Sequence, residues 1–237
     1  MSEVANIEFS RRKFFQVSGA VAASAALAAC TSVSERLPSI TPIEPAPPPA
    51  PEPALGGYAQ MYASVTDEGF QLPAIPVDKV DNRFLRQMVQ DPTGEMPGTI
   101  VVDTKQHFLY LVRPGGQAMR YGVGLGRAGF AWSGRAVVQW KRKWPTWKVP
   151  DEMIARQPEL EKYSVANGGM EPGLKNPLGS RALYIFQDGE DTLYRIHGSP
   201  EWWTIGKSVS SGCVRMINQD VMDLYDRVPN RTPIVVY

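Results

Sequence analysis

Most of this chain is predicted to fold as a mainly β domain with a few short helices, on three observations. From Pro97 to the C-terminus, short β-branched or apolar runs alternate with turn residues. Two of these runs, 182–186 and 193–197, flank an Asp188-Gly189 turn and predict a β-hairpin. The clearest helical spacing of apolar residues lies in 219–227, near the end of the chain.

The other predicted strands follow one another closely along the domain. Residues 99–103 and 107–112 are apolar and rich in β-branched or aromatic side chains, and a turn separates them. An Arg-Pro-Gly-Gly turn ends the second strand at residue 116. Three more strands are expected, at residues 118–126, 135–140 and 233–237.

Few helices interrupt these strands. Asn218 is expected to cap a helix over 219–227, whose Asp220 suits the positive end of the helix dipole. Residues 151–160 have helical character that Pro158 limits. The glycine-rich segment 167–173 predicts a surface loop that borders the active site.

Three tryptophans, Trp140, Trp144 and Trp147, come close together around two prolines. They could pack in the core and its loops, or they could form a wall of a substrate groove. The sequence favours neither interpretation over the other.

The N-terminus is a targeting segment and is left out of the fold. Ser10-Arg11-Arg12-Lys13-Phe14-Phe15 is similar to a twin-arginine export motif, and the apolar, alanine-rich run 17–29 follows it. Leu27-Ala28-Ala29-Cys30 resembles a bacterial lipobox, which predicts cleavage before Cys30 and a lipid on that cysteine. We therefore expect a signal peptide over 1–29 and a lipid-anchored protein in the periplasm or cell envelope, exported by the twin-arginine route.

Residues 30–96, between the targeting segment and the main domain, form two parts of different composition. Residues 30–55 are proline-rich and predict an extended linker. Residues 56–96 predict an extension that packs on the main domain, with Tyr58, Met61 and Tyr62 on one helical face and a short helix over 81–89.

The net charge of +1 argues against a nucleic-acid partner.

Only two cysteines are present, Cys30 and Cys213. If Cys30 carries a lipid, then Cys213 is a free thiol in an oxidising compartment, and chemistry explains it better than packing does. The alternatives are a Cys30–Cys213 disulfide, which would pin a flexible N-terminus to the loop of Cys213, or a Cys213 that serves as a small buried apolar residue.

A candidate catalytic pair lies sixteen residues apart, at His197 and Cys213. A thiol attacks as the thiolate, and a nearby imidazole is the usual base that produces one. Ser210, Ser211 and Gly212 are turn formers that predict a tight loop in front of the helix, with Cys213 exposed on it. The other histidine, His107, sits in a predicted strand without such a motif and is expected to be structural.

This stretch resembles the signature of the L,D-transpeptidase catalytic domain (YkuD type). The sequence reads HGS at 197–199 and SSGCVRM at 210–216, with Ser211 where many members of that family have a second histidine. Four further segments resemble the same family from residue 97 onward: 100–112, 121–127, 143–153 and 176–185. The resemblance thus covers 97–237 and implies an L,D-transpeptidase-like β-sandwich or barrel.

The resemblance also implies roles for single residues. Cys213 would be the nucleophile and His197 the base, with the second ring nitrogen of His197 held by a backbone carbonyl near position 198 or 199. Backbone N–H groups around Gly212 and Cys213 would form the oxyanion hole. Arg215, with Gly198 and Ser199, would contact the substrate, Arg215 through a carboxylate of the peptide stem.

The activity so implied is acyl transfer on peptidoglycan tetrapeptide stems through a cysteine acyl-enzyme. The products would be 3→3 cross-links, or a protein attached to the wall. The same Cys–His pair would serve an L,D-carboxypeptidase or another peptidoglycan hydrolase. A non-catalytic wall-binding lipoprotein is the alternative from another class. We expect no cofactor and no metal site, because two histidines and one free thiol are too few ligands.

Overall fold

The computed structural model describes residues 55–126, 132–210 and 212–237. A sheet of nine strands, ordered β12-β10-β9-β8-β13-β4-β5-β6-β3, dominates this part of the chain. The mainly β fold class predicted from the sequence is confirmed. The strands of this sheet are β3 (Gln87–Gln90), β4 (Ile100–Asp103), β5 (Phe108–Arg113), β6 (Gln117–Gly122), β8 (Gly134–Lys143), β9 (Arg181–Gln187), β10 (Glu190–Ser199), β12 (Val214–Ile217) and β13 (Thr232–Val236).

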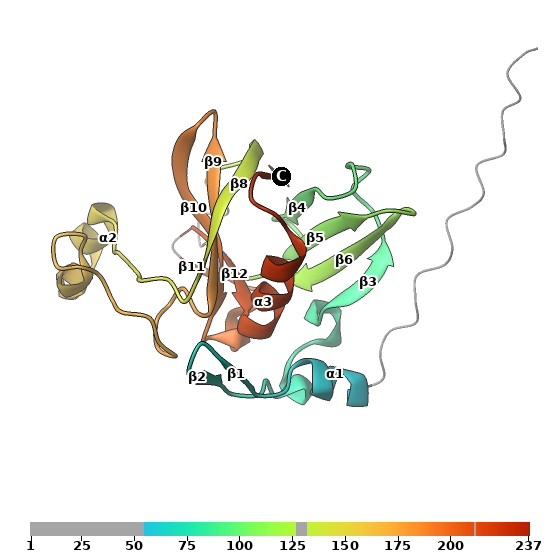
Figure 1. Ribbon diagram of the computed structural model, residues 1–237, viewed down its shortest axis with the longest axis horizontal. Helices are drawn as coiled ribbons and strands as arrows, with labels where there is room; N and C mark the ends of the chain where they lie inside the picture. The colour runs from blue at the N-terminus through green and yellow to red at the C-terminus, as the bar shows by residue number, and fades with distance from the viewer. Residues whose placement is uncertain (1–54, 127–131, 211) are drawn as a thin grey trace, which may run out of the picture. The chain divides into compact units, whose positions relative to one another are not determined.

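The two ends of this strand order come together. β12 stands at one end of the order, and β6 is next to the other end. The backbone of Gly124, two residues beyond β6, exchanges two hydrogen bonds with that of Arg215 in β12, at 2.9 and 2.8 Å. The sheet therefore curls towards a barrel, which matches the expected sandwich or barrel (Figure 1).

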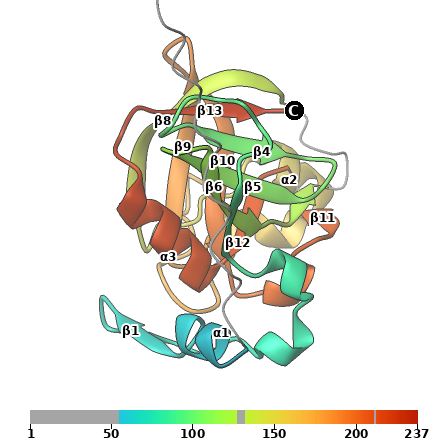
Figure 2. The ribbon, with the colours of Figure 1, turned by 90° about the vertical axis from the view of Figure 1, so that its right-hand side faces the viewer.

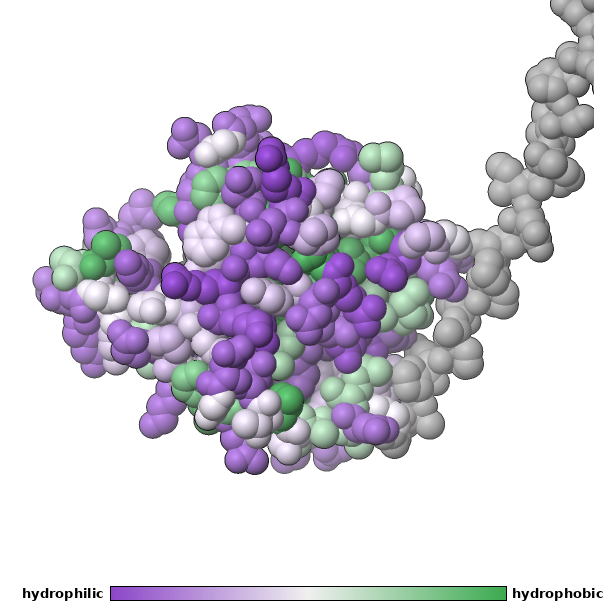
Figure 3. Space-filling model, in the orientation of Figure 1, coloured by the Kyte–Doolittle hydropathy of each residue, from purple (hydrophilic) through white to green (hydrophobic). Residues whose placement is uncertain are grey.

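Strands in the middle of the sheet are buried on both faces. In β4, Ile100 and Val102 belong to an inner core, whereas Val101 belongs to an outer one, as the two-residue period of a strand requires. Helix α3 (Asn218–Arg227) contributes Val221 and Leu224 to the inner core, beside β9, β10 and β12. The face shown in Figure 3 is largely hydrophilic.

The extension 55–96 covers the outer face of β4, β5 and β6. Its helix α1 (Leu55–Met61) and the residue that follows bury Tyr58 and Tyr62, as the helical spacing predicted. The extension also contains strands β1 (Val65–Asp67) and β2 (Phe70–Leu72) and the 3-10 turns η1 (Val77–Lys79) and η2 (Asn82–Phe84). In Figure 2 the blue and teal extension lies below the sheet.

Two of the predicted elements were wrong. Residues 81–89 do not form a helix, because 87–90 pair with β6 as the edge strand β3. The strand expected over 118–126 is interrupted at Val123, and Leu125–Gly126 form a separate strand, β7, that pairs with β11 (Ser208–Ser210). The helical character predicted for 151–160 is confirmed, because α2 (Asp151–Arg156) ends before Pro158 and the 3-10 turn η3 (Pro158–Tyr163) follows.

The three tryptophans have different surroundings. Trp144 is buried, and its indole N–H donates to Asp67 at 2.7 Å. Trp140 is 36% exposed and stacks on Tyr184 with ring centroids 3.5 Å apart. Trp147 packs near Tyr163, in the excursion that carries α2 and η3 away from the sheet.

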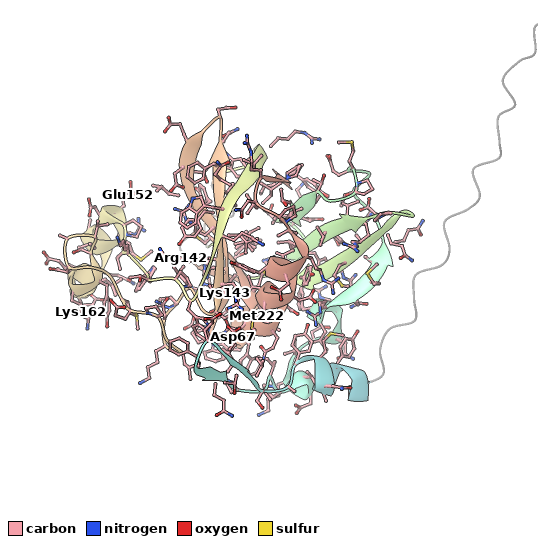
Figure 4. All side chains as sticks on the ribbon, in the orientation of Figure 1. Asp67, Arg142, Lys143, Glu152, Lys162 and Met222 are labelled. Atoms are coloured by element: carbon pink, nitrogen blue, oxygen red, sulfur yellow. The ribbon has the colours of Figure 1, made fainter. Side chains whose placement is uncertain are left out.

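Charged side chains fasten the extension to the main domain along a surface that we call the seam. Asp67 accepts two hydrogen bonds from the Arg181 guanidinium, at 2.7 and 2.9 Å. Figure 4 labels Asp67 beside Lys143 of β8, whose amine pairs with the neighbouring Glu68. The seam residues are Tyr62, Asp67 and Arg86 of the extension and Arg181, Asp220 and Asp223 of the domain.

Candidate active site

Two neighbouring parallel strands carry the candidate catalytic pair. The register of β10 and β12 sets Ile196 beside Val214 and His197 beside Arg215. Ile196 and Val214 face the inner core, so His197 and Arg215 face the other side of the sheet. Cys213 lies immediately before β12, where the backbone N–H of Arg195 in β10 hydrogen-bonds to its sulfur. The fold thus sets Cys213 directly before the strand that pairs with the one carrying His197.

His197 is buried, with only 5% of its surface exposed. Its Nδ1 lies 2.6 Å from the carbonyl oxygen of Gly198, so Nδ1–H donates there and Nε2 keeps its lone pair. Burial lowers the pKa of His197 to about 4; the Gly198 and Pro177 carbonyls oppose this change, and the charge of Arg215 adds to it. The imidazole is therefore neutral near pH 7, in the form that accepts a proton. The expected carbonyl near position 198 or 199 is present.

Within the described residues Cys213 is not part of a disulfide, and the residue is partly exposed. Burial raises its pKa above the ordinary value, against the Arg195 N–H and the guanidinium charges of Arg195 and Arg215, which favour the thiolate. The resting thiol is consequently neutral, like the imidazole. Proton transfer between the two would have to accompany attack on a substrate, because neither group is ionised beforehand.

Close backbone packing holds the His-Gly-Ser segment. A Cβ at Gly198 would collide with the amide oxygen of Asn218, and it would lie 3.0 Å from Val221 Cγ1. The Asn218 side chain accepts from the Ser180 N–H at 2.9 Å and donates to the Ser199 carbonyl at 3.1 Å. These contacts fix the backbone on which the His197 ring is anchored.

The prediction that Asn218 caps the helix was wrong. The helix begins at Asn218 itself, and the preceding Ile217 occupies the cap position without a side-chain hydrogen bond. The asparagine amide is already engaged with Ser180 and Ser199. Sequence reasoning missed its positioning role because both partners are distant along the chain.

The residues expected to contact substrate have other partners in the structure. The Ser199 hydroxyl is buried and accepts from the Glu201 N–H at 3.1 Å. Arg215 forms an ion pair with Glu201 at 2.8 Å. A stem carboxylate would therefore have to share or displace Glu201, and the substrate roles of Gly198, Ser199 and Arg215 stay predictions.

The loop before the nucleophile turns sharply at Gly212. Its φ of +136° lies in a region that side-chain-bearing residues rarely adopt, as the turn prediction required. A Cβ there would lie 3.4 Å from Tyr194 Cε1, so the tyrosine ring covers this glycine. Tyr194 lies near Trp132, at 6.5 Å between ring centroids. These two aromatic residues border the site, and no motif had pointed to them.

Some predicted residues lie beyond what the structure describes. Ser211 and Cys30 fall outside the described residues, and of Ser210 only the backbone is described, as the last residue of β11. Within the described ranges, no three His, Cys, Asp or Glu side chains gather as they would around a metal ion. None of the helices there is both long enough and apolar enough to cross a membrane.

Curated relatives resemble the second part of the chain. "Probable L,D-transpeptidase ErfK/SrfK" of Escherichia coli K12 is 33% identical over 141 residues, which cover 58% of this chain and 43% of that protein. "Probable L,D-transpeptidase YbiS" of the same strain is 29% identical over 145 residues, with the same two coverages. The chain thus matches less than half the length of these relatives.

A similar solved structure comes from Brucella melitensis and is described as "Probable carnitine operon oxidoreductase caia". It is 50% identical, with a TM-score of 0.46, and the match covers 63% of this chain and 91% of that one. An L,D-transpeptidase from Mycobacterium smegmatis is 18% identical, with a TM-score of 0.43, and the match covers 59% and 58%. Both TM-scores are below 0.5.

The family match decides the assignment. The L,D-transpeptidase catalytic domain (YkuD) matches residues 97–236, more than half of the chain, and this range includes both strands of the candidate pair. The chain belongs to the L,D-transpeptidase catalytic domain family.

Proposed function

We propose that this protein is a transpeptidase that acts on peptidoglycan tetrapeptide stems, with Cys213 as nucleophile and His197 as base. The observation that carries the proposal is the register of β10 and β12. It sets His197, whose Nδ1–H donates to the Gly198 carbonyl, on the strand beside the one that Cys213 directly precedes.

The first half-reaction forms a thioester. Cys213 Sγ attacks the carbonyl of the third, diamino acid residue of the stem, while His197 Nε2 accepts the thiol proton. The carbonyl electrons move to oxygen, and backbone N–H groups around Gly212 and Cys213 stabilise that oxyanion. When the electrons return, the C–N bond to the terminal D-alanine breaks, and His197 donates its proton to the leaving amine.

The second half-reaction restores the enzyme. An acceptor amine attacks the thioester carbonyl and loses a proton to His197, and the C–S bond breaks to give the thiol again. A second stem as acceptor gives a 3→3 cross-link, whereas a protein lysine gives an attached protein. Water as acceptor would make the protein an L,D-carboxypeptidase or another peptidoglycan hydrolase.

The charges around the pair suit this sequence of events. Both reactants are neutral at rest, and they become charged only when the proton moves during attack. The guanidiniums of Arg195 and Arg215 then stabilise the developing thiolate, as their effect on the thiol pKa indicates. They also disfavour an imidazolium, which helps His197 to release its proton to the leaving amine.

The cellular setting is part of the proposal. The motif at 10–15 and the lipobox at 27–30 support export by the twin-arginine route and a lipid anchor on Cys30 in the periplasm or cell envelope. The linker 30–55 would then hold the enzyme away from the membrane, within reach of the wall.

The test uses the full chain with purified disaccharide tetrapeptide, followed by mass analysis of the products. Wild type is expected to give a dimer one D-alanine lighter than two substrates. Cys213→Ala and His197→Ala should each lower the rate by at least about 10³-fold, because the nucleophile or its base is lost. Cys30→Ser, which changes the only other cysteine, serves as the matched control and should retain the activity.

The other outcomes separate the alternatives. Tripeptide without dimer would identify a carboxypeptidase. No turnover by a folded wild-type protein would contradict the enzymatic proposal and favour the wall-binding lipoprotein.

A further inference from the structure

A cavity lies beside the loop that precedes the candidate nucleophile. It has a volume of about 320 Å³, near the lower end of the range for small-molecule sites. The extension supplies one wall through η1 and η2, and the segment around η4 (Trp202–Thr204) supplies the other. Figure 2 shows these turns together at the lower right, where teal-green meets orange. The lining residues used below are Lys79, Phe84, Trp202, Trp203, Gly206 and Lys207.

The packing between the two walls is close. Gly206 has a φ of +77°, and a Cβ there would collide with the ring of Phe84. That ring packs 5.5 Å, centroid to centroid, from Phe108 in β5. The extension and the loop are therefore locked together at the base of the cavity, which makes the cavity a built feature of the fold.

An exposed indole and two cations line this cavity. Trp203 is 52% exposed and meets Trp202 edge-on, with ring centroids 5.7 Å apart. Among the described residues, neither Lys79 nor Lys207 has an ion-pair partner, whereas Asp81 on the same rim is paired with Arg83. The cavity thus offers a flat apolar surface next to two ammonium groups, with one carboxylate, Asp81, on the same rim.

The same loop reaches the candidate active site. Glu201, directly before Trp202, holds the Arg215 guanidinium of β12. The Lys207 carbonyl accepts from the Leu125 N–H, and β11 follows towards Cys213. A ligand in the cavity therefore contacts the segment that connects to the nucleophile.

We propose that this cavity binds the disaccharide part of a peptidoglycan unit, and this proposal rests on the proposed function. The apolar face of a pyranose ring stacks on Trp203, as sugars do on exposed indoles. A carboxylate of the stem lies near the ammonium groups of Lys79 and Lys207. The saccharide then anchors the unit while its peptide reaches Cys213.

The test measures binding by calorimetry on the full chain carrying Cys213→Ala, which prevents turnover. The probes are disaccharide tetrapeptide, free tetrapeptide and the neutral disaccharide of N-acetylglucosamine. Disaccharide tetrapeptide is expected to bind about tenfold more tightly than free tetrapeptide, and Trp203→Ala should remove that advantage. Replacing Lys79 and Lys207 by Gln should weaken only the carboxylate-bearing probes, severalfold. Trp140→Ala, at the half-exposed indole on β8, is the matched control and should change nothing.

Equal affinity for disaccharide tetrapeptide and free tetrapeptide, or an equal loss in the Trp203 and Trp140 variants, would overturn the cavity proposal. The two proposals fail in different ways. Saccharide binding that depends on Trp203, without acyl transfer by the wild type, would leave the cavity site and remove the enzyme. Acyl transfer that Trp203→Ala leaves unchanged would retain the enzyme and remove the cavity site.

Discussion

Ionisable groups are buried both in the seam and at the His197–Cys213 pair, but different kinds of partner offset the cost of burying them. In the seam, carboxylates meet guanidiniums directly, as Asp67 meets Arg181. At the pair, the direct partners are backbone groups, the Gly198 carbonyl for the imidazole and the Arg195 N–H for the thiol. Asp67 and Asp223 of the seam are stabilised as ions, whereas the pair is stable as neutral molecules that can exchange a proton.

The residues that fasten the extension and the candidate catalytic residues therefore lie in different regions. The first turn of α3 contacts both regions. Asn218 binds the backbone beside the candidate site. Gln219 donates to the Ala63 and Pro73 carbonyls of the extension, and Asp220 accepts from the Tyr62 hydroxyl at 3.1 Å. Three consecutive residues thus couple the two regions, and substitutions in each region should separate their effects.

The largest effect on stability is expected at Asp67. Asp67→Asn leaves the buried Arg181 guanidinium without its charged partner, which should lower the free energy of unfolding by about 3 kcal/mol at pH 7. Hydrogen bonds from Arg181 hold the pKa of Asp67 below its usual range, so the wild-type advantage should shrink as pH falls through that lowered pKa. Urea unfolding at pH 7 and pH 3 measures both.

Glu68→Gln is the matched control for that substitution. It removes the neighbouring carboxylate, whose partner Lys143 is exposed, and should leave the unfolding midpoint unchanged. An equal loss in both variants would show that the seam does not depend on the buried pair.

Asn218→Ala should affect both regions. It leaves the Ser180 N–H and the Ser199 carbonyl without their partner in a buried setting, which should cost about 2 kcal/mol of unfolding free energy. Because the backbone beside His197 is released, we expect kcat for disaccharide tetrapeptide to fall about tenfold while KM changes little. Asn167→Ala, in an exposed loop, is the control. A loss of stability with an unchanged kcat would remove the positioning role.

The candidate pair could be proposed from local sequence patterns, whereas the seam could not. His197 and Cys213 were identifiable because their neighbours form local motifs and a hairpin delivers the histidine. Asp67 and Arg181 are 114 residues apart, and Tyr62 and Asp220 are 158 apart, so no local pattern links them. The fold class followed from strand periodicity, whereas the edge strand β3 depends on a partner, β6, that its own sequence does not reveal.

Neutralising Asp220 should change the free energy of unfolding less than Asp67→Asn does, and should increase it. Burial raises its pKa to about 7, so the folded state binds a proton more tightly than the unfolded chain and loses stability as pH rises from about 4 through 7. Asp220→Asn should match wild type near pH 4 and exceed it by about 1 kcal/mol at pH 8, with part of the gain offset by lost attraction to Arg86.

Asp223→Asn is the contrasting variant. Although burial alone would raise the pKa of Asp223, Arg227 and Arg86 hold it below its ordinary value, so its neutralisation should destabilise the protein at pH 8. If Asp220→Asn destabilised the protein as much at that pH, the seam would need both carboxylates ionised.

The smallest effect is expected at Arg215, whose positive charge acts on both members of the pair. Arg215→Gln should raise the pKa of His197, so the acid edge of kcat/KM moves to higher pH and activity near pH 5 falls severalfold relative to pH 7. It should also raise the pKa of Cys213, so alkylation of that residue by iodoacetamide at pH 8 slows. Peptide mapping distinguishes alkylation of Cys213 from alkylation of Cys30. The control is Arg113→Gln, at the exposed end of β5, which should shift neither pH profile. If activity fell while both pH profiles stayed unchanged, Arg215 would instead be a substrate-binding residue. The neutral state of His197 and Cys213 would then not depend on the charge of this arginine.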